Sequence, residues 1–189
     1  MKRSRLRRAA IARLLVFAGF AMAGLSLMEG ATVNLFPSED TGLFQNEPDN
    51  NLGAQDFIPI GRTFVPTLGR GLIRFNLSSI PSNASISSVS LRITSVFGGG
   101  GGMTPYGVYR MSTAWTEGGG VGGPDAAGGV GAPAVAGEAT WNDPKHLSGT
   151  WGSPGAASGV DYVTTASASV TLVALGNHTF SSAALVADV

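Results

Sequence analysis

The sequence contains no cysteine and only two histidines, His146 and His178. Disulfide bonds, thiol catalysis and thiolate metal sites are therefore excluded. With two histidines in the chain, a metal site built from several histidines is not expected either. Because no disulfide can staple the chain, a folded structure of this size has to be stabilised by a hydrophobic core.

Charged residues are also scarce, at 13% of the chain, and they are unevenly placed. Residues 32–189 keep six of the 12 basic residues and 11 of the 12 acidic residues, a net charge near −5. Nucleic-acid binding needs a basic surface, so no nucleic-acid partner is expected. The other six basic residues lie within the first 13 positions: Lys2, Arg3, Arg5, Arg7, Arg8 and Arg13.

This basic start is followed by a short apolar run at 14–28. The order is typical of a secretory signal peptide, which we place at 1–31, with cleavage after Ala23 or Ala31. A run of 15 residues is shorter than the roughly 20 that span a bilayer. We therefore expect residues 32–189 to form one secreted or cell-surface domain without a membrane span. An uncleaved N-terminal anchor is the alternative.

Long amphipathic helical periodicity is absent as well, and short segments with period-2 alternation take its place, separated by Gly, Pro, Asn and Ser. This pattern predicts an all-β fold, an antiparallel β-sandwich. In the clearest strand, 86–96, Val89, Leu91 and Ile93 alternate with Ser90, Arg92 and Thr94. In the strand 70–77, Ile73, Phe75 and Leu77 share the face opposite Leu72, Arg74 and Asn76. The other expected strands are 32–36, 56–60, 106–111, 161–165, 167–175 and 179–181.

Two stretches are too rich in glycine for strand interiors. Residues 98–102 are five consecutive glycines, and residues 118–137 consist mainly of Gly, Ala, Pro and Val with one charge. Strand-like sequence continues on both sides of 118–137, and neither half is long enough to bury a core of its own. We therefore predict a long flexible loop at 118–137 within one domain.

Several segments, taken in order, resemble a known family. They are Asn50-Asn51-Leu52-Gly53, Leu72-Ile73-Arg74-Phe75-Asn76-Leu77-Ser78-Ser79-Ile80-Pro81, Ile86-Ser87-Ser88-Val89-Ser90-Leu91-Arg92-Ile93, Trp115-Thr116-Glu117-Gly118, Ala139-Thr140-Trp141-Asn142 and Trp151-Gly152-Ser153-Pro154-Gly155. Their content resembles the DNRLRE, or disaggregatase-related, domains, which are similar to a carbohydrate-binding module family with a jelly-roll β-sandwich. The six-letter motif that names the domains is absent from this sequence.

The resemblance implies a non-catalytic module that binds extracellular polysaccharide, often acidic, or a structural domain of the cell surface. Fold-level kinship alone does not give the function. The family also continues with a further strand beyond the point where this sequence stops. We expect residues 184–189 to begin that strand, as in a truncated reading frame.

Arginines and a tyrosine are the expected ligand-binding residues. Arg74, Arg92 and Arg110 each lie on a predicted strand and would form a basic stripe if those strands were neighbours. A guanidinium binds a carboxylate through two hydrogen bonds, which suits uronic acids. If Val108 faces inward, Tyr109 faces outward. The alternative for the arginines is pairing with acidic side chains, namely Glu117, Glu138 or Asp161.

The three tryptophans, Trp115, Trp141 and Trp151, have two possible roles. Aromatic faces suit the C–H groups of sugars, but large aromatic side chains also dominate hydrophobic cores. These tryptophans lie in the segments that the family pattern fixes, so we expect them in the core.

The acidic residues allow two other sites. Asp40, Asp49 and Asp56 lie in an oxygen-rich stretch and are candidate ligands of a structural calcium ion, although the spacing matches no EF-hand and a solvated loop is the alternative. No other cofactor is expected. Glu117 with Glu138 or Asp161 is the pair that a glycosidase would need. Nothing in the sequence brings such a pair together, so we expect no enzyme. A polysaccharide lyase or hydrolase ranks behind the binding module and the structural protein.

Overall fold

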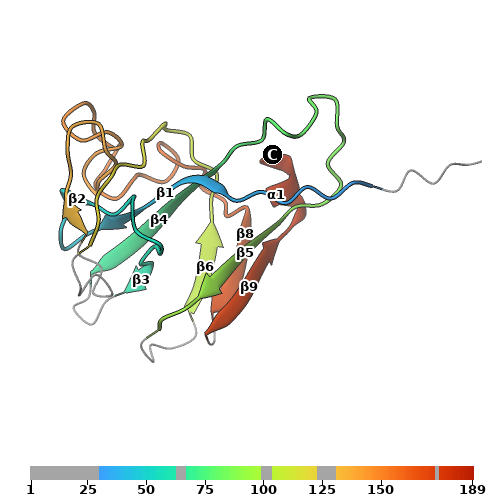
Figure 1. The fold of residues 1–189 in the computed structure, drawn as a ribbon, viewed down its shortest axis with the longest axis horizontal. Helices are drawn as coiled ribbons and strands as arrows, with labels where there is room; N and C mark the ends of the chain where they lie inside the picture. The colour runs from blue at the N-terminus through green and yellow to red at the C-terminus, as the bar shows by residue number, and fades with distance from the viewer. Residues whose placement is uncertain (1–29, 63–66, 99–103, 123–130, 173–174) are drawn as a thin grey trace, which may run out of the picture. The chain divides into compact units, whose positions relative to one another are not determined.

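The structure is a computed structural model that describes residues 30–62, 67–98, 104–122, 131–172 and 175–189 (Figure 1). Contacts divide the chain into two units, Met1–Thr32 and Val33–Val189. Every strand and helix described below belongs to the second unit. Among the described residues, no helix has the length and apolar character that crossing a bilayer requires.

The described strands pair only in the antiparallel sense. A three-stranded sheet has the order β1-β4-β3, with β1 at Pro37–Phe44, β4 at Leu68–Phe75 and β3 at Gly61–Arg62. Three two-stranded sheets pair β2 (Asn50–Asn51) with β7 (Ala132–Pro133), β5 (Ser90–Ser95) with β9 (Gly176–Ser181) and β6 (Thr104–Val108) with β8 (Ala168–Leu172). The predicted all-β antiparallel sandwich is confirmed.

The β1–β4 pair buries one face against the tryptophans. Thr41 pairs with Leu72 and Leu43 pairs with Arg70, so these four side chains share a face. Thr41 and Leu43 are fully buried and Leu72 is 6% exposed. Arg74 lies two residues beyond Leu72 and therefore points to the same side. The prediction that Arg74 lies opposite the buried face of its strand is wrong, because the tryptophan-bearing loops cover the face that carries Leu72.

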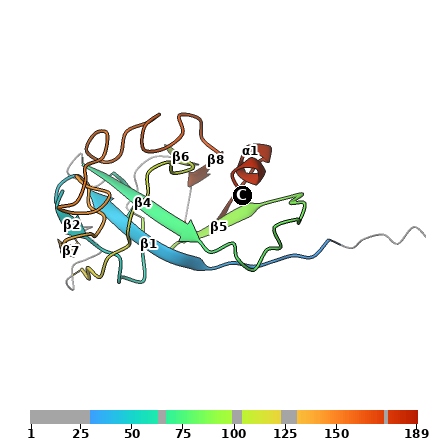
Figure 2. The same ribbon diagram turned by 90° about the horizontal axis from the view of Figure 1, so that it is seen from above.

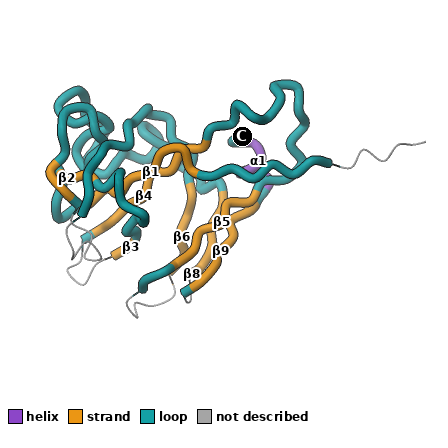
Figure 3. Tube along the Cα trace, in the orientation of Figure 1, coloured by secondary structure: helices purple, strands orange, loops and turns teal. Residues whose placement is uncertain are grey.

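The three tryptophans form the centre of the hydrophobic core, as predicted. Trp115, Trp141 and Trp151 are 4%, 6% and 4% exposed and pack with Leu43, Leu72, Ala139 and Ala156. Their backbones lie in loops rather than strands. Figure 3 shows loops gathered beside β1, β2 and β4. Gly155 has a φ of 85°, and a Cβ there would lie 2.6 Å from Trp141 Cζ2. A glycine at this turn thus lets the Trp141 ring pack against the chain.

Asn51 holds several of these loops together from a fully buried position. Its Nδ2 donates to Thr41 Oγ1 at 3.1 Å and to the carbonyl oxygens of Glu117 and Ala139 at 2.6 and 2.8 Å. Its Oδ1 accepts from the backbone nitrogens of Gly53 and Gly120. A single amide therefore joins β1 to two of the three tryptophan-bearing segments, those of Trp115 and Trp141, and to the start of the glycine-rich loop.

The described ends of the predicted loop 118–137 are held by hydrogen bonds. Gly120 is buried at Asn51, and Ala132 pairs with Asn51 through the β2–β7 ladder. The flexibility expected for this loop stays a prediction for residues 123–130, which lie outside the described residues.

The β5–β9 and β6–β8 pairs are separate two-stranded sheets. Figure 2 shows β6 and β8 above β5. In the β5–β9 pair, Leu91 pairs with Phe180, which is 2% exposed, and Ile93 pairs with His178. Ser90, Arg92 and Thr94 are exposed, so the alternation predicted for this strand is confirmed.

Several predicted boundaries were wrong. The strand expected at 32–36 begins only at Pro37, and 56–60 and 161–165 are not strands. Tyr162 makes two isolated bridges instead, to Met111 and Ser158. The strand expected at 184–189 is a short helix, α1 (Ala183–Ala187), because Ser182 caps it by accepting from Leu185 N and the alanines favour helix.

Candidate functional site

The three predicted ligand-binding arginines do not form a stripe. Arg74 lies on β4, Arg92 on β5 and Arg110 after the end of β6, and these strands belong to three different sheets. The stripe required neighbouring strands, which the strand pairing does not provide. Each arginine therefore has its own environment.

The side chain of Arg74 is held by contacts within the protein. Its Nη1 lies 2.6 Å from Glu39 Oε2, and its Nη2 donates to the carbonyl oxygen of Trp115 at 2.6 Å. Its Cζ also lies 4.6 Å from the centroid of the Trp115 ring. The guanidinium thus packs on the Trp115 ring, and both of its terminal nitrogens bind protein oxygens.

Arg110 is half exposed and pairs with Asp188, with 3.2 Å between Nε and Oδ1. Asp188 is the C-cap of α1 and also accepts a hydrogen bond from Ser167 Oγ. Arg110 therefore links the end of β6 to the helix, and its charge is already compensated by a carboxylate.

Arg92 differs from both. Its side chain is exposed at the middle of β5, and it makes no ion pair or hydrogen bond with the side chains of the described residues. The alternative expectation, pairing with Glu117, Glu138 or Asp161, is therefore wrong for Arg92. An uncompensated guanidinium keeps all five donors for an external acceptor.

Arg92 lies within an exposed polar surface, which we name the Arg92 face. Arg92 pairs with Thr179, Thr94 with Asn177 and Ser90 with Ser181 across the β5–β9 ladder. All six side chains are exposed, and Thr94 Oγ1 donates to Asn177 Oδ1 at 2.7 Å. Cross-strand partners lie about 5 Å apart and point to the same side. The Arg92 face thus places four hydroxyls and one amide around one cation.

The acidic residues considered for catalysis serve the framework instead. Glu117 Oε1 accepts from Asp40 N at 2.7 Å, and the two carboxylate oxygens of Glu138 accept from the backbone nitrogens of Gly119 and Val135. Asp161, 2% exposed, accepts from Thr113 Oγ1 and from the backbone nitrogens of Gly152 and Ala157. Each carboxylate fixes a loop by binding main-chain N–H groups.

The three aspartates predicted as calcium ligands are not gathered into a metal-binding group; among the described residues no cluster of three His, Asp or Glu residues has that geometry. Asp49 Oδ1 accepts from Asn142 Nδ2 at 2.9 Å, and Asp56 is exposed in a bend. Burial, and secondarily the negative charge of Glu117, raises the pKa of Asp40. Calcium binding stays a prediction.

Tyr109 faces solvent, as its position next to an inward-facing Val108 predicts, and is 43% exposed. Its ring meets Tyr162 edge-on, with 5.3 Å between the centroids and 65° between the planes. The centroid of the Tyr162 ring in turn lies 5.9 Å from Cζ of Arg70. Arg70 is not among the predicted site residues, because the sequence pattern predicts the face of Leu72, which Arg70 shares, as the exposed face of its strand.

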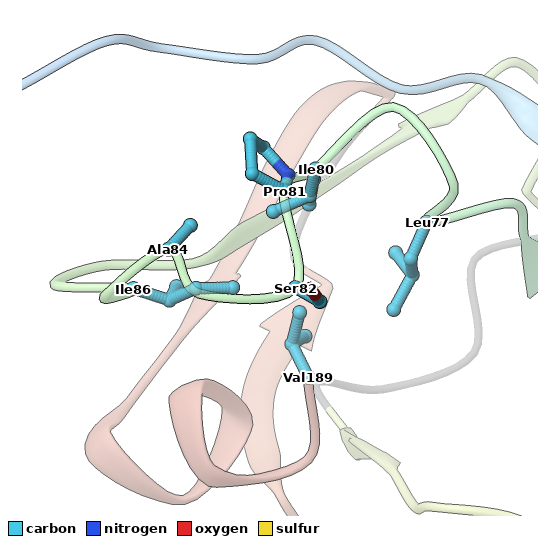
Figure 4. Close-up of a pocket in the computed structure, with 7 residues that line it drawn as sticks. All are labelled: Leu77, Ile80, Pro81, Ser82, Ala84, Ile86 and Val189. Atoms are coloured by element: carbon cyan, nitrogen blue, oxygen red, sulfur yellow. The ribbon is translucent and has the colours of Figure 1, made fainter.

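Two surface hollows lie beside α1. One is lined by Leu77, Ile80, Pro81, Ser82, Ala84, Ile86 and Val189 (Figure 4). Ser82 is the only lining residue there with a polar side chain, so this hollow lacks the groups that would orient a sugar. The second is lined by Ser87, Ser88, Val89, Ser181, Ser182, Ala183 and Val186. It borders the Arg92 face at Ser181, and Ser182 is already used as the helix cap.

Residues 31–120, slightly less than half of the chain, match the family model of carbohydrate-binding module family 96. The match confirms the predicted resemblance to a carbohydrate-binding module family. It covers β1 to β6, and so includes Arg92 and Tyr109 but neither Trp141 nor Trp151. No curated protein and no solved structure matches the chain.

Proposed function

We propose, from the match to a carbohydrate-binding module family, that this chain is an exported, non-catalytic module that binds an acidic polysaccharide on the Arg92 face. The observation that carries the proposal is the exposed guanidinium of Arg92, which no acidic side chain of the described residues compensates. Arg74 and Arg110, by contrast, are paired with Glu39 and Asp188.

The chemistry of the Arg92 face suits a uronic-acid polymer. A guanidinium binds a carboxylate through two parallel hydrogen bonds, and the hydroxyls of Ser90, Thr94 and Thr179 can donate to or accept from sugar hydroxyls. The face is exposed along both strands, so it fits a segment of a chain rather than an enclosed small molecule. Residues 32–189 as a whole are acidic, with a net charge near −5, which disfavours general capture of polyanions and leaves recognition to this local cation.

Two features support a module without catalysis. The carboxylates that a glycosidase or lyase would need are bound to main-chain nitrogens, as described for Glu117, Glu138 and Asp161. The Arg92 face itself carries no carboxylate and no histidine. A general acid or base within reach of a substrate bound there is therefore missing from its six residues.

The test is affinity electrophoresis of the protein in gels that contain a uronic-acid polymer or a neutral glucan. The wild type should be retarded by the acidic polymer, and Arg92→Ala should lose most of that retardation. Arg62→Ala is the matched control, because Arg62 is an exposed arginine on β3 and its removal changes the net charge equally. Equal retardation of Arg92→Ala and wild type would refute the site. Absence of retardation on every polymer would favour the structural surface role.

A further inference from the structure

The β6–β8 pair carries a second exposed surface, on a different sheet from the Arg92 face. We name it the Tyr109 face: Pro105, Gly107, Tyr109, Ser169 and Thr171, all exposed. Gly107 pairs with Ser169 and Pro105 pairs with Thr171, so these residues point to the same side of the ladder. The Tyr109 face combines an aromatic ring with two hydroxyls and carries no charged side chain.

The ring of Tyr109 lies close to the backbone of Gly107. A Cβ atom at residue 107 would lie 2.8 Å from Tyr109 Cε2, 3.0 Å from its Oη and 3.1 Å from its Cζ, so a larger residue there would displace the ring. A glycine at this position therefore lets the ring approach the main chain. Tyr109 nevertheless remains 43% exposed.

A second contact fixes the orientation of the ring. The rings of Tyr109 and Tyr162 form a T-shaped pair, an arrangement that the ring quadrupoles favour. Tyr162 packs on the tryptophan core, and Arg70 lies near its ring while donating to the carbonyl oxygens of Gly155 and Ala156. Tyr109 is thus held in place by Tyr162, which itself packs on the core. A ligand would therefore not have to order the Tyr109 side chain on binding.

We propose that Tyr109 is a stacking platform for the apolar face of a neutral pyranose ring, and that Ser169 and Thr171 hydrogen-bond to its hydroxyls. The C–H groups on one face of a pyranose carry partial positive charge, which the negative face of an aromatic ring attracts. The same quadrupole disfavours a carboxylate above the ring. Arg110 nearby is compensated by Asp188, so the Tyr109 face favours neutral sugars whereas the Arg92 face favours acidic ones.

This inference rests on the proposed carbohydrate-binding function but not on the Arg92 site, because neither Arg92 nor an acidic polymer takes part in it. The probes are soluble neutral polysaccharides, a glucan, a mannan and a galactan, used in affinity gels with the full chain. At least one should retard the wild type, and Tyr109→Ala should weaken that binding about tenfold, the equivalent of losing 1.4 kcal/mol. Tyr109→Phe keeps the ring and should retain most of the affinity.

Two further variants separate a positioned platform from a generally sticky aromatic surface. Gly107→Ala adds a methyl group under the ring and should weaken neutral-sugar binding while Tyr109 itself is unchanged. Phe97→Ala removes a phenylalanine that is 71% exposed after β5 and should bind like the wild type. Arg92→Ala should also keep neutral-sugar binding. Each variant is melted first, so that binding is compared between folded proteins.

The proposal is overturned if none of the three neutral polymers retards the wild type, or if Tyr109→Ala binds as the wild type does. It is overturned as well if Phe97→Ala loses as much affinity as Tyr109→Ala. Loss of acidic-polymer binding in Arg92→Ala together with retained neutral-polymer binding supports two independent sites.

Discussion

Arg70 and Trp141 are joined by a cation–π contact, with 5.5 Å between the guanidinium Cζ and the centroid of the indole ring. The same guanidinium donates through Nη1 to the carbonyl oxygens of Gly155 and Ala156, in the loop that packs against Trp141. Arg70 thus ties the central strand β4 to a core loop that has no strand partner of its own. Its positive charge contributes to the fold rather than to a ligand site.

Replacement of Arg70 by alanine should destabilise the fold. The variant loses the ring contacts and leaves two carbonyl oxygens without their donor, so the free energy of unfolding should fall by about 2–3 kcal/mol. Arg70→Lys keeps the charge but not the planar fork and should recover only part of the loss. Urea denaturation followed by tryptophan fluorescence measures both. Arg62→Ala, at an exposed arginine, should stay within about 0.5 kcal/mol of the wild type. Equal stability of Arg62→Ala and Arg70→Ala would show that the contacts contribute nothing.

Replacement of Asn51 by aspartate tests whether this buried amide holds the loops together. The variant keeps the acceptor Oδ1 but turns an oxygen toward the carbonyl oxygens of Glu117 and Ala139, where Nδ2 now donates. We expect a loss of about 3 kcal/mol or more, since buried acceptors would face one another. Asn46→Asp, at an exposed turn, is the control. Cooperative urea unfolding of the two variants at similar midpoints would contradict this role.

The strands with strict alternation were predictable from the sequence. Ser90–Ser95 has one buried and one wet face, so its period-2 pattern appears directly in the residues. β1 was missed because both of its faces are covered at its end: Leu43 packs on the core and its neighbour Phe44 is 2% exposed on the opposite side. Such a strand shows no alternation. The stretch at 32–36 does alternate, with Val33 and Leu35 separated by a polar residue, and therefore predicts the strand too early in the sequence.

The candidate site was predictable only as a set of separate residues. Whether Arg74, Arg92 and Arg110 share a surface depends on strand pairing over long sequence distances, such as β5 with β9 across 80 residues. A single sequence carries no signal for that pairing. The positions of Thr179 and Asn177 beside Arg92 depend on the same pairing. The predicted strand 179–181 includes Thr179 but not Asn177. The prediction of the face on which Arg74 lies was wrong. Leu72 on that face is covered by loops and not by the strands of a second sheet.

The stability of the protein should depend on the ionisation of Asp40. Burial, and then the charge of Glu117, raises the pKa of this carboxyl above its ordinary value of 3.8. The folded state therefore binds the Asp40 proton more tightly than the unfolded state. Above the folded-state pKa the ionised carboxylate opposes folding, and this penalty is relieved as the pH falls toward 3.8. Asp40→Asn should raise the melting temperature at pH 7.

The gain from Asp40→Asn should shrink as the pH is lowered and vanish below about 3.8, where both states carry the proton. Thermal melts of the wild type and the variant between pH 3 and pH 8 measure the difference. Asp56→Asn, at an exposed aspartate, serves as the control for removing one negative charge. A melting-temperature gain that is the same at every pH, or is matched by Asp56→Asn, would exclude this source.

Arg74 and Arg92 should separate stability from binding. Arg74→Ala loses the ion pair with Glu39, the hydrogen bond to the Trp115 carbonyl and the contact with the Trp115 ring, so its free energy of unfolding should fall by about 2 kcal/mol. Arg92→Ala removes no ion pair or hydrogen bond with a described side chain and should stay within about 0.5 kcal/mol of the wild type. The effect on binding should be the reverse of the effect on stability. Dissociation constants for a uronic-acid polymer, measured well below the melting temperature of either variant, should be raised by Arg92→Ala and not by Arg74→Ala. Arg92→Ala should bind weakly and lose the sensitivity to added salt that an exposed charge contact confers, while folded Arg74→Ala should bind as the wild type does. If Arg74→Ala also binds weakly while still folded, the ligand reaches the β4 arginine, and the Arg92 face is not the whole acidic-sugar site.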